Sequence, residues 1–439
     1  MNLLSLALLL CCAAFAEVTV LKNFTLIDGT GRAPVAGSAM IIQDGRISWV
    51  GSATALKVPN GAEVNDLSGK FVMPGMINLH GHLGLVVGLT QDPKFFTREN
   101  VEKSLQTYAS YGVTSVLSMG TDQPLIYKMR EEQRGARPST TRIFTAGRGF
   151  TGIAGYPTSA PGLKGVPYEV ATTGQAQAFM KELAAHKPDA VKMWVDDHLG
   201  KQNKIQLELA RAVVSAARTH NLRSAAHVFY LEDAKQLATA GLNAFAHSVR
   251  DKPVDDELIR IMKQKGTWLI APTLTREAST FVYAKPAPFL SDAFFTRSVS
   301  PEVVSTLKTE GYQKKVAADP DFRHYPAFLE TAKQNLKRLA DAGVKFGFGT
   351  DSGPPARFPG FFEHWEMDLM VDAGLTPMQV IMAASKQSSE FLGMSKDLGT
   401  LEPGKWADLL VLQQDPLKDI KNTRSLQAVY IAGKPVSAR

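Results

Sequence analysis

The sequence predicts an α/β protein in which a (β/α)8 barrel of the TIM type carries a small β-sandwich domain built from both chain ends. Three observations support this prediction. Short apolar segments alternate with amphipathic helical stretches through the middle of the chain, and β-rich segments occupy both ends. No Gly-x-Gly-x-x-Gly turn follows the first apolar segment, which disfavours the alternative of an open, doubly wound sheet.

The barrel is predicted to span residues 73–395. Amphipathic helices are expected between most of its strands, for example over residues 206–220 and 232–240. The eight strand candidates are 76–83, 113–119, 143–146, 190–195, 223–227, 243–247, 268–272 and 345–351.

Two connections, residues 151–173 and 273–325, are too long for plain loops. The first is rich in Gly and Pro, and the second contains several aromatic residues. Both follow predicted strands, so they are expected on the face where barrels keep their active sites, as walls or lids over a pocket. Surface insertions without a role are the alternative.

The β-sandwich domain is predicted from residues 17–72 and 396–439. Asp44-Gly45 lies between two β-rich runs and predicts a hairpin. Residues 408–412 and 427–432 have the same β-rich character and precede a second turn at Gly433. Pairing of the two ends would let the middle of the chain fold as one closed unit.

Residues 1–16 predict a cleavable signal peptide. An apolar core leads to Ala14-Phe15-Ala16, a typical cleavage site, and the core is too short to span a bilayer as a mature helix. Cleavage after Ala16 would remove both cysteines and deliver a secreted or periplasmic protein. The alternative is a buried N-terminal strand or helix. No later segment has the length and apolarity of a membrane-spanning helix, so no membrane insertion is expected.

The composition is that of an ordinary globular protein, with 44% hydrophobic and 21% charged residues among 439. The formal net charge of +7 comes from scattered Lys and Arg, which indicates a solvated surface and not a nucleic-acid interface. The expected partner is a small-molecule substrate, and association into a homo-oligomer is compatible with the sequence.

Candidate metal ligands lie where predicted strands end. His80 and His82 are two residues apart, so their imidazoles point the same way from one strand. His227, His247 and Asp351 each follow an apolar run. Each alone is equally compatible with a structural hydrogen bond or a helix cap. Together they occupy the rim from which barrel enzymes project catalytic groups, and this donor set suits zinc or a similar divalent ion.

Lys192 lies inside an apolar segment, where a charged amine is costly to desolvate. An outward-facing lysine, or a buried pair with Asp196 or Asp197, is one interpretation. The other is a deprotonated amine that reacts with carbon dioxide to give a carbamate, an anion able to bridge two metal ions.

These motifs resemble the amidohydrolase superfamily in its two-metal, carboxylated-lysine form, within the imidazolonepropionase-related and prolidase-like (Xaa-Pro or Xaa-Arg/Lys dipeptidase) group. The resemblance covers nearly the whole mature chain. Its parts are Pro74-Gly-Met-Ile-Asn-Leu-His-Gly-His82, the lysine of Val191-Lys-Met193, His227, His247, Gly349-Thr-Asp351 and the closing segment from Gly399 to Leu412.

The resemblance implies two divalent metal ions, with zinc expected. His80 and His82 would bind the more buried ion together with Asp351. His227 and His247 would bind the second, and Lys192, carboxylated by carbon dioxide, would bridge both. The one-metal deaminase branch of the superfamily has Glu at the position of Tyr230, which argues against that branch.

The expected function is hydrolysis of an amide or peptide-like C–N bond in a small substrate, such as a dipeptide or N-acyl amino acid, by a metal-bridging hydroxide. Asp351, Lys192 and His247 are expected to take part in catalysis. Tyr230, Arg148 and Arg250 are candidate substrate contacts, the arginines as a bidentate clamp on a carboxylate; packing and surface ion pairs are the alternatives. A hydrolase of cyclic amides, esters or lactones and a non-catalytic binding relative are the competing functions.

Overall fold

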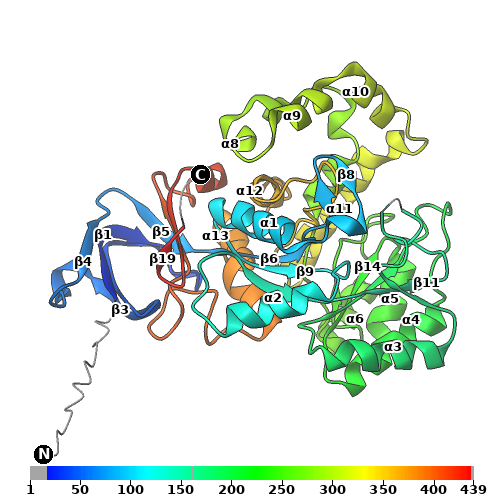
Figure 1. The fold of residues 1–439 in the computed structure, drawn as a ribbon, viewed down its shortest axis with the longest axis horizontal. Coiled ribbons are helices and arrows are strands. Elements are labelled where there is room, and N and C mark those ends of the chain that lie inside the picture. The colour runs from blue at the N-terminus through cyan, green and yellow to red at the C-terminus, as the bar shows by residue number, and fades with distance from the viewer. Residues whose placement is uncertain (1–16, 161, 437–439) are drawn as a thin grey trace, which may run out of the picture.

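The computed structural model describes residues 17–160 and 162–436, so the predicted signal peptide lies outside the described residues. The molecule is a mixed α/β protein with a β domain beside a larger α/β body. Figure 1 shows blue and red ribbons together at one side, which means that the two ends of the chain meet in the β domain.

The β domain is one sheet of eight strands in which β5 and β17 join the two halves of the chain. The order is β19-β18-β17-β5-β1-β2-β3, and β4 pairs with β1 beside β5. The bounds are β1 Val18–Leu26, β2 Val35–Gln43, β3 Arg46–Ser52, β4 Glu63–Asp66, β5 Phe71–Pro74, β17 Leu409–Leu412, β18 Leu426–Ile431 and β19 Lys434–Pro435.

The sequence predicts two packed sheets, whereas the backbone pairing connects all eight strands. The long strand β1 explains this difference. Its first half pairs with β4 and its end pairs with β5 on the same edge. Between them Asn23 has a φ of 66° at a register shift against β2. This irregularity lets one strand serve two neighbours and keeps the sheet continuous.

Strand β17 belongs to two hydrophobic cores at once. Leu409 and Val411 pack in the core of the β domain, whereas Leu410 and Leu412 pack in the main core of the α/β body. Alternate side chains of a strand point to opposite faces, so an uninterrupted apolar run is what this position requires. The β domain is therefore packed directly onto the α/β body.

The α/β body contains two parallel sheets, with orders β10-β9-β6 and β12-β11-β13-β14-β15-β16. The first seven strand segments predicted from the sequence each overlap one of these strands. The bounds are β6 Met76–Gly81, β9 Val113–Ser118, β10 Arg142–Thr145, β11 Phe150–Gly152, β12 Tyr168–Val170, β13 Val191–Val195, β14 Ser224–Val228, β15 Ala244–Phe245 and β16 Trp268–Leu269.

The eighth predicted strand, 345–351, forms one isolated bridge, between Phe346 and Leu269, so no single closed ring of strands runs through the described residues. It nevertheless lies between the two sheets. The Leu269 N–H donates to the Lys345 carbonyl oxygen at 3.0 Å, and the Leu79 N–H donates to the Phe348 carbonyl oxygen at 2.7 Å. The segment contains Gly347 and Gly349, which weaken a regular strand.

Helices cover the outside of these sheets (Figure 1). The two helices expected from the sequence correspond to α4 and α5. Within the described residues, no helix has the length and apolarity that crossing a bilayer requires. The bounds are α1 Arg98–Ser110, α2 Leu125–Arg134, α3 Thr173–Ala185, α4 Leu207–Thr219, α5 Leu231–Thr239, α6 Asp256–Lys265, α11 Tyr325–Asp341, α12 Phe361–Asp372, α13 Pro377–Met382 and α14 Ser388–Leu392.

The long connection 273–325 is a helical insertion, seen at the top of Figure 1. It contains α7 Leu274–Ser279, α8 Ala293–Thr296, α9 Pro301–Lys308 and α10 Glu310–Ala317. Its aromatic side chains, including Phe289 and Phe295, pack with Phe361 at the start of α12. They form a separate small core, and this explains why the segment is so rich in aromatic residues. A short hairpin of β7 Val86–Val87 and β8 Thr90–Gln91 lies next to this insertion, and Leu89 in its turn packs against the insertion's small core.

Candidate metal centre

All six predicted ligands come from the parallel strands, from the residues directly after them, or from the segment between the sheets. Lys192 follows Ala190 by two residues in β13, and His227 follows Ala225 by two residues in β14. Both alanines belong to the same inner apolar cluster, so the strand period carries the two ligands onto that inner face. The small alanine side chains leave the space that the larger functional groups occupy.

The structure brings these six side chains together. The His80 ring centroid is 4.7 Å from that of His247 and 5.4 Å from that of His82, and the His227 and His247 centroids are 4.0 Å apart. The Lys192 Nζ atom lies 3.2 Å from His80 Nε2. Asp351 Oδ1 lies 3.0 Å from His82 Nε2 and 3.7 Å from His80 Nε2.

Each histidine ring is oriented through one of its nitrogens, which leaves the other available. Nδ1 of His80 donates to the Ala246 carbonyl oxygen at 2.8 Å. Nε2 of His227 lies 2.6 Å from Asp196 Oδ2, which leaves Nδ1 to present a lone pair. Carboxylates and carbonyl oxygens in this position are typical of metal-binding histidines, because they fix the tautomer.

The remaining two rings use hydroxyl groups in the same way. Nδ1 of His82 lies 2.7 Å from Thr121 Oγ1, and Nδ1 of His247 lies 2.8 Å from Thr273 Oγ1. The Nε2 atoms of these rings are therefore the ones that face the centre.

Burial keeps the imidazoles neutral. It lowers the pKa of His227 to about 3, against the opposing effect of Asp196. It also lowers the pKa values of His80 and His247 well below the ordinary value, and that of His82 to a smaller extent. Neutral imidazole is the form that binds a metal ion, so these rings are in the ligand-competent state at neutral pH.

Asp351 lies at the meeting point of several positive groups. Burial alone would raise the pKa of its carboxyl group, but the positive charge of Arg357 beside it outweighs that effect and holds the pKa well below its usual range. Arg357 forms a very short contact with Asp351, and Arg276 Nε lies 4.0 Å from Oδ2. The carboxylate is therefore ionised and able to bind a cation or accept a proton.

Lys192 is completely buried, and this burial lowers the pKa of its amine to about 7. Its side chain runs across Gly120, where a β-carbon would come within 2.7 Å of Lys192 Cγ. Gly120 also has a φ of 92°, a conformation that glycine adopts without strain. The glycine thus provides the space through which the lysine reaches the histidines.

A cavity of about 540 Å³ opens onto the ligands. Residues from the connection 151–173 form part of its wall, as the sequence predicts, whereas the helical insertion contributes Lys315. The described lining residues other than the ligands include Leu85, Val86, Leu89, Thr121, Tyr156, Pro157, Ala160, Leu163, Trp194, Lys315, Pro354 and Arg357.

The three predicted substrate contacts are not among those lining residues. The Tyr230 hydroxyl donates to Asp197 at 2.7 Å. Arg148 donates to the carbonyl oxygens of Val166, Gly165 and Pro167 at the edge of another cavity. Arg250 is buried, with Nε 3.0 Å from Glu277. Both arginines are thus engaged within the protein and not directed at the metal centre.

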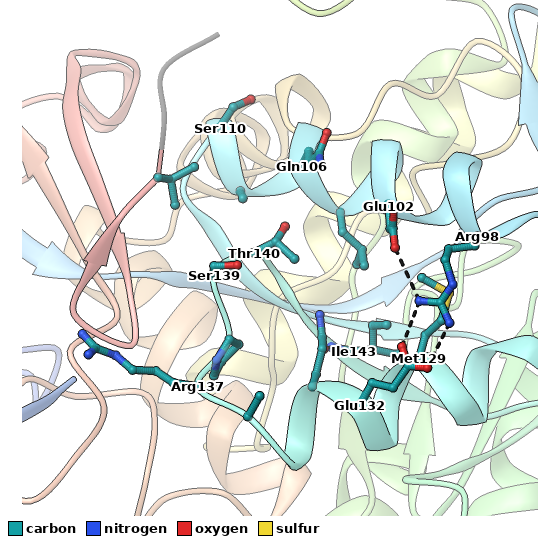
Figure 2. Close-up of a pocket in the computed structure, with 16 residues that line it drawn as sticks. Arg98, Glu102, Gln106, Ser110, Met129, Glu132, Arg137, Ser139, Thr140 and Ile143 are labelled. Atoms are coloured by element: carbon teal, nitrogen blue, oxygen red, sulfur yellow. Dashed lines mark hydrogen bonds and ion pairs between the residues drawn. The ribbon is translucent and has the colours of Figure 1, made fainter. Parts of the chain in front are cut away.

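A second cavity of about 540 Å³ lies between α1 and α2, as Figure 2 shows. At one end of it Arg98 forms an ion pair with Glu132 at 2.8 Å. Its described lining residues include no histidine and none of the predicted site residues. The two cavities have the same volume, but the described lining of this one does not bring together a comparable cluster of metal-binding side chains.

Four supporting residues were not predicted from the sequence: Asp196, Thr121, Thr273 and Arg357. Asp196 directly follows β13, at a strand end like the ligands, and that position was the available signal. The two threonines and Arg357 lie in loops after strands, and their contacts depend on the path of the backbone.

The donor set fits a divalent metal. Ligand atoms of His80, His247 and Asp351 all lie within 4.8 Å of one another, and all three residues are buried. Neutral imidazoles with one ionised carboxylate match the preferences of zinc and related ions. His82, His227 and Lys192 adjoin this trio and offer further donors.

The match to known proteins decides the family. Residues 71–436 match the Amidohydrolase family. The chain belongs to this family. It is accordingly a hydrolase that acts on carbon–nitrogen bonds of small substrates with the help of metal ions, in agreement with the resemblance found in the sequence.

Individual relatives are distant but match over most of their length. The chain is 24% identical to an imidazolonepropionase of Streptomyces griseus over 90% of each chain, and 26% identical to a dihydroorotase of Pelotomaculum thermopropionicum over 90% and 89%. A solved prolidase complexed with N-methylphosphonate-L-proline is 22% identical, with a TM-score of 0.75 over 96% of this chain and all of that one.

Proposed function

We propose that this amidohydrolase cleaves an amide or peptide-like bond in a dipeptide or N-acyl amino acid. The observation that carries the proposal is the meeting of four neutral imidazoles, Lys192 and Asp351 beside one cavity. A cavity of about 540 Å³ is of the size that holds a small molecule. The similarity to a solved prolidase is the reason why dipeptides come first among the candidate substrates.

We infer a pair of divalent ions, with zinc as the expected metal. His80, His82 and Asp351 would hold the more buried ion, and His227 and His247 would hold the second. The pair supplies a Lewis acid for the substrate carbonyl and a water molecule with a lowered pKa. Asp196, Thr121 and Thr273 orient three of the imidazoles for this task.

Lys192 is proposed to carry a carboxylate. Its neutral amine would attack the carbon of carbon dioxide, forming an N–C bond and releasing one proton to solvent, which leaves an anionic carbamate. Full burial and a pKa lowered to about 7 support this reaction, because they make the neutral amine accessible near neutral pH. The carbamate would bridge the two ions.

Asp351 is proposed to move the proton. It would accept a proton from the attacking water and return it to the leaving nitrogen, so one carboxylate serves as base and then as acid. Its place beside His82 and His80 puts it within reach of both steps. Arg357 and Arg276 keep it ionised before the reaction begins.

Two finer structural proposals complete this assignment. The two parallel sheets are proposed to form one closed (β/α)8 barrel. Residues 345–351 bond to both sheets, and on the other side the Asp189 N–H donates to the Thr145 carbonyl oxygen at 2.8 Å.

The signal peptide is proposed to be cleaved after Ala16, giving a secreted or periplasmic enzyme. N-terminal sequencing of the exported protein should then begin at Glu17.

The test combines metal analysis with a substrate panel of dipeptides, N-acyl amino acids, cyclic amides and lactones. We expect two bound divalent ions per chain and turnover of a dipeptide or N-acyl amino acid. Turnover confined to cyclic amides or lactones would favour the second candidate, which the imidazolonepropionase and dihydroorotase relatives support. A chain that binds no metal would instead indicate a non-catalytic relative.

A further inference from the structure

The cavity beside the metal centre carries an excess of positive charge. Apart from the histidines, the charged residues among its described lining are Lys315, Arg357 and Asp351. Asp351 is proposed as a metal ligand, so its charge is committed to the metal centre. Arg357 is paired with Asp351 through one nitrogen, and Lys315 forms no ion pair with any described residue, so both cations keep donors for a substrate.

Arg357 has a fixed backbone and a side chain with unused donors. Its N–H donates to the Pro354 carbonyl oxygen at 3.0 Å, and its carbonyl oxygen accepts from the Gly353 N–H at 2.8 Å. One Nη atom contacts Asp351, while Nε and the other Nη have no hydrogen-bond partner within the described chain. The side chain is 17% exposed and lines the cavity. A guanidinium has five N–H donors in one plane, which matches a carboxylate.

Arg276, the other arginine near Asp351, pairs with a different carboxylate and lies outside the described cavity lining. Its Nη1 donates to Glu277 at 2.6 Å. Arg148 and Arg250, the arginines predicted from the sequence as a clamp, are likewise occupied by protein groups. Arg357 is therefore the arginine that the structure leaves open to a ligand.

Lys315 adds positive charge at the mouth of the cavity. It lies on α10 and forms no ion pair with any described residue, whereas its neighbour Lys314 pairs with Glu310 at 2.6 Å. An exposed, unpaired lysine beside a pocket attracts anions over several ångströms.

The rest of the wall is largely apolar. Leu85 and Leu89 contribute from the region of the β7–β8 hairpin, Ala160 and Leu163 from the connection 151–173, and Trp194 from β13. A ligand that fills this space should carry an apolar group as well as a negative charge.

We infer that the substrate is an amide bearing both a carboxylate and an apolar group, with the carboxylate bound by Arg357 and drawn in by Lys315. This inference rests on the proposed amide hydrolysis and specifies its substrate. It replaces the predicted Arg148 and Arg250 clamp with one residue that faces the cavity.

The experiment compares two probes that share one scissile amide. N-benzoyl-L-phenylalanine carries a carboxylate, and N-benzoyl-phenethylamine has hydrogen in its place. For the metal-loaded wild-type enzyme we expect the acid to bind about 10- to 100-fold more tightly by calorimetry, the range for a hydrogen-bonded charge. The same ratio is expected in kcat/KM.

Arg357→Gln should abolish this preference, whereas Arg357→Lys should keep part of it. The ratio of the two probes is the readout because an indirect effect on the metal centre would change both probes equally. Lys315→Gln should mainly slow association of the acid and reduce its salt dependence. The matched control Lys314→Gln, on the same helix but already paired, should behave as wild type.

A wild-type enzyme that binds both probes equally would overturn the inference, as would an undiminished preference in Arg357→Gln. Failure of the proposed function would look different. In that case neither probe, nor any amide of the panel, would be hydrolysed, while the calorimetric comparison would still report on the carboxylate site.

Discussion

At the scale of single residues, the site depends on groups whose charge state is set by burial. Lys192, His80 and His247 are wholly enclosed, yet each is polar, so each must either lose its charge or gain a partner. The histidines lose the charge, and Asp351 keeps its own because arginines lie beside it. Substitutions here should therefore separate metal binding from proton transfer.

Asp351→Asn is expected to lower kcat by about 10²- to 10⁴-fold, because the amide cannot accept a proton. Metal content, measured by mass spectrometry of the dialysed protein, should fall much less, since the histidines remain. His80→Ala is the contrasting variant and should lose metal outright. Near-normal turnover by Asp351→Asn would contradict the proton-transfer role.

Lys192 predicts a pH-dependent stability of the metal-free protein in buffer free of carbon dioxide. In the folded state its amine loses the proton near pH 7, whereas in the unfolded chain it keeps the proton up to about 10.5. The unfolded state therefore holds more protons between these values, and the unfolding free energy should rise with pH across that window.

Denaturant titration of the wild type and of Lys192→Met measures this effect. The difference between them should increase in favour of the wild type by up to about 1.4 kcal/mol per pH unit above pH 7 and stay constant below it. Parallel stability curves from pH 6 to 9.5 would show that the amine is not desolvated as described.

The site could be predicted to the extent that it follows from strand ends. His80, His82, His227 and Lys192 follow the two-residue period of strands, and a barrel assigns all strand ends to one rim. Arg357 could not be found in this way. Its guanidinium reaches Asp351 through a turn that begins at Gly353, and no local pattern encodes where such a turn leads.

At the scale of elements, helix α12 supports the segment that carries Asp351. Oε1 of Glu363 accepts hydrogen bonds from Asn78, Thr350 and Ser352, all at 2.7 Å. Thr350 and Ser352 flank Asp351, and Asn78 in turn accepts a hydrogen bond from the His80 N–H at 2.8 Å. One buried carboxylate thus holds in register the two segments that carry the proposed ligands His80 and Asp351, as a positioning residue.

Glu363→Gln should weaken metal binding by about 10- to 100-fold, which is typical when a group behind a ligand is lost. It should lower kcat with little change in KM, because Glu363 does not line the cavity. Titration with a fluorescent zinc chelator measures the affinity. Asp372→Asn, an acid-to-amide change at the exposed end of the same helix, is the control and should leave both quantities unchanged. Equal effects in the two variants would exclude the positioning role.

The sequence predicts some helices and strands more closely than others, and the difference has a physical reason. Long apolar runs such as β13 and amphipathic helices such as α4 have strong periodicity, and both lie close to their predicted bounds. The segment 345–351 is apolar but lies between two sheets without regular pairing, so its composition predicts a strand that the backbone does not complete. The aromatic residues of 273–325 suggested a wall or lid, but most of them pack together in a separate hydrophobic core.

At the scale of the whole molecule, metal removal should destabilise the protein without unfolding it. The apolar cores of the β domain and the α/β body do not depend on the ions. Bound metal at 1,000 times its dissociation constant would add about 4 kcal/mol to stability.

Dialysis against a chelator should therefore abolish activity and lower the melting temperature in calorimetry while the far-ultraviolet circular dichroism is retained. Zinc with bicarbonate should restore both properties. Sodium salts at the same ionic strength serve as the control. An enzyme that stays fully active after the chelator treatment would rule out the proposed chemistry.

The pairing of β5 with β17 also governs how the chain is made. Val72 and Val411 are neighbours in the sheet, although almost the entire α/β body lies between them in sequence. During translation β5 cannot pair with β17 until the C-terminal segment has left the ribosome, so one edge of the early strands stays unpaired until then. Shortening the tail by a few dozen residues would leave that edge exposed for good, so nonsense mutations near the end of the gene should be as damaging as early ones.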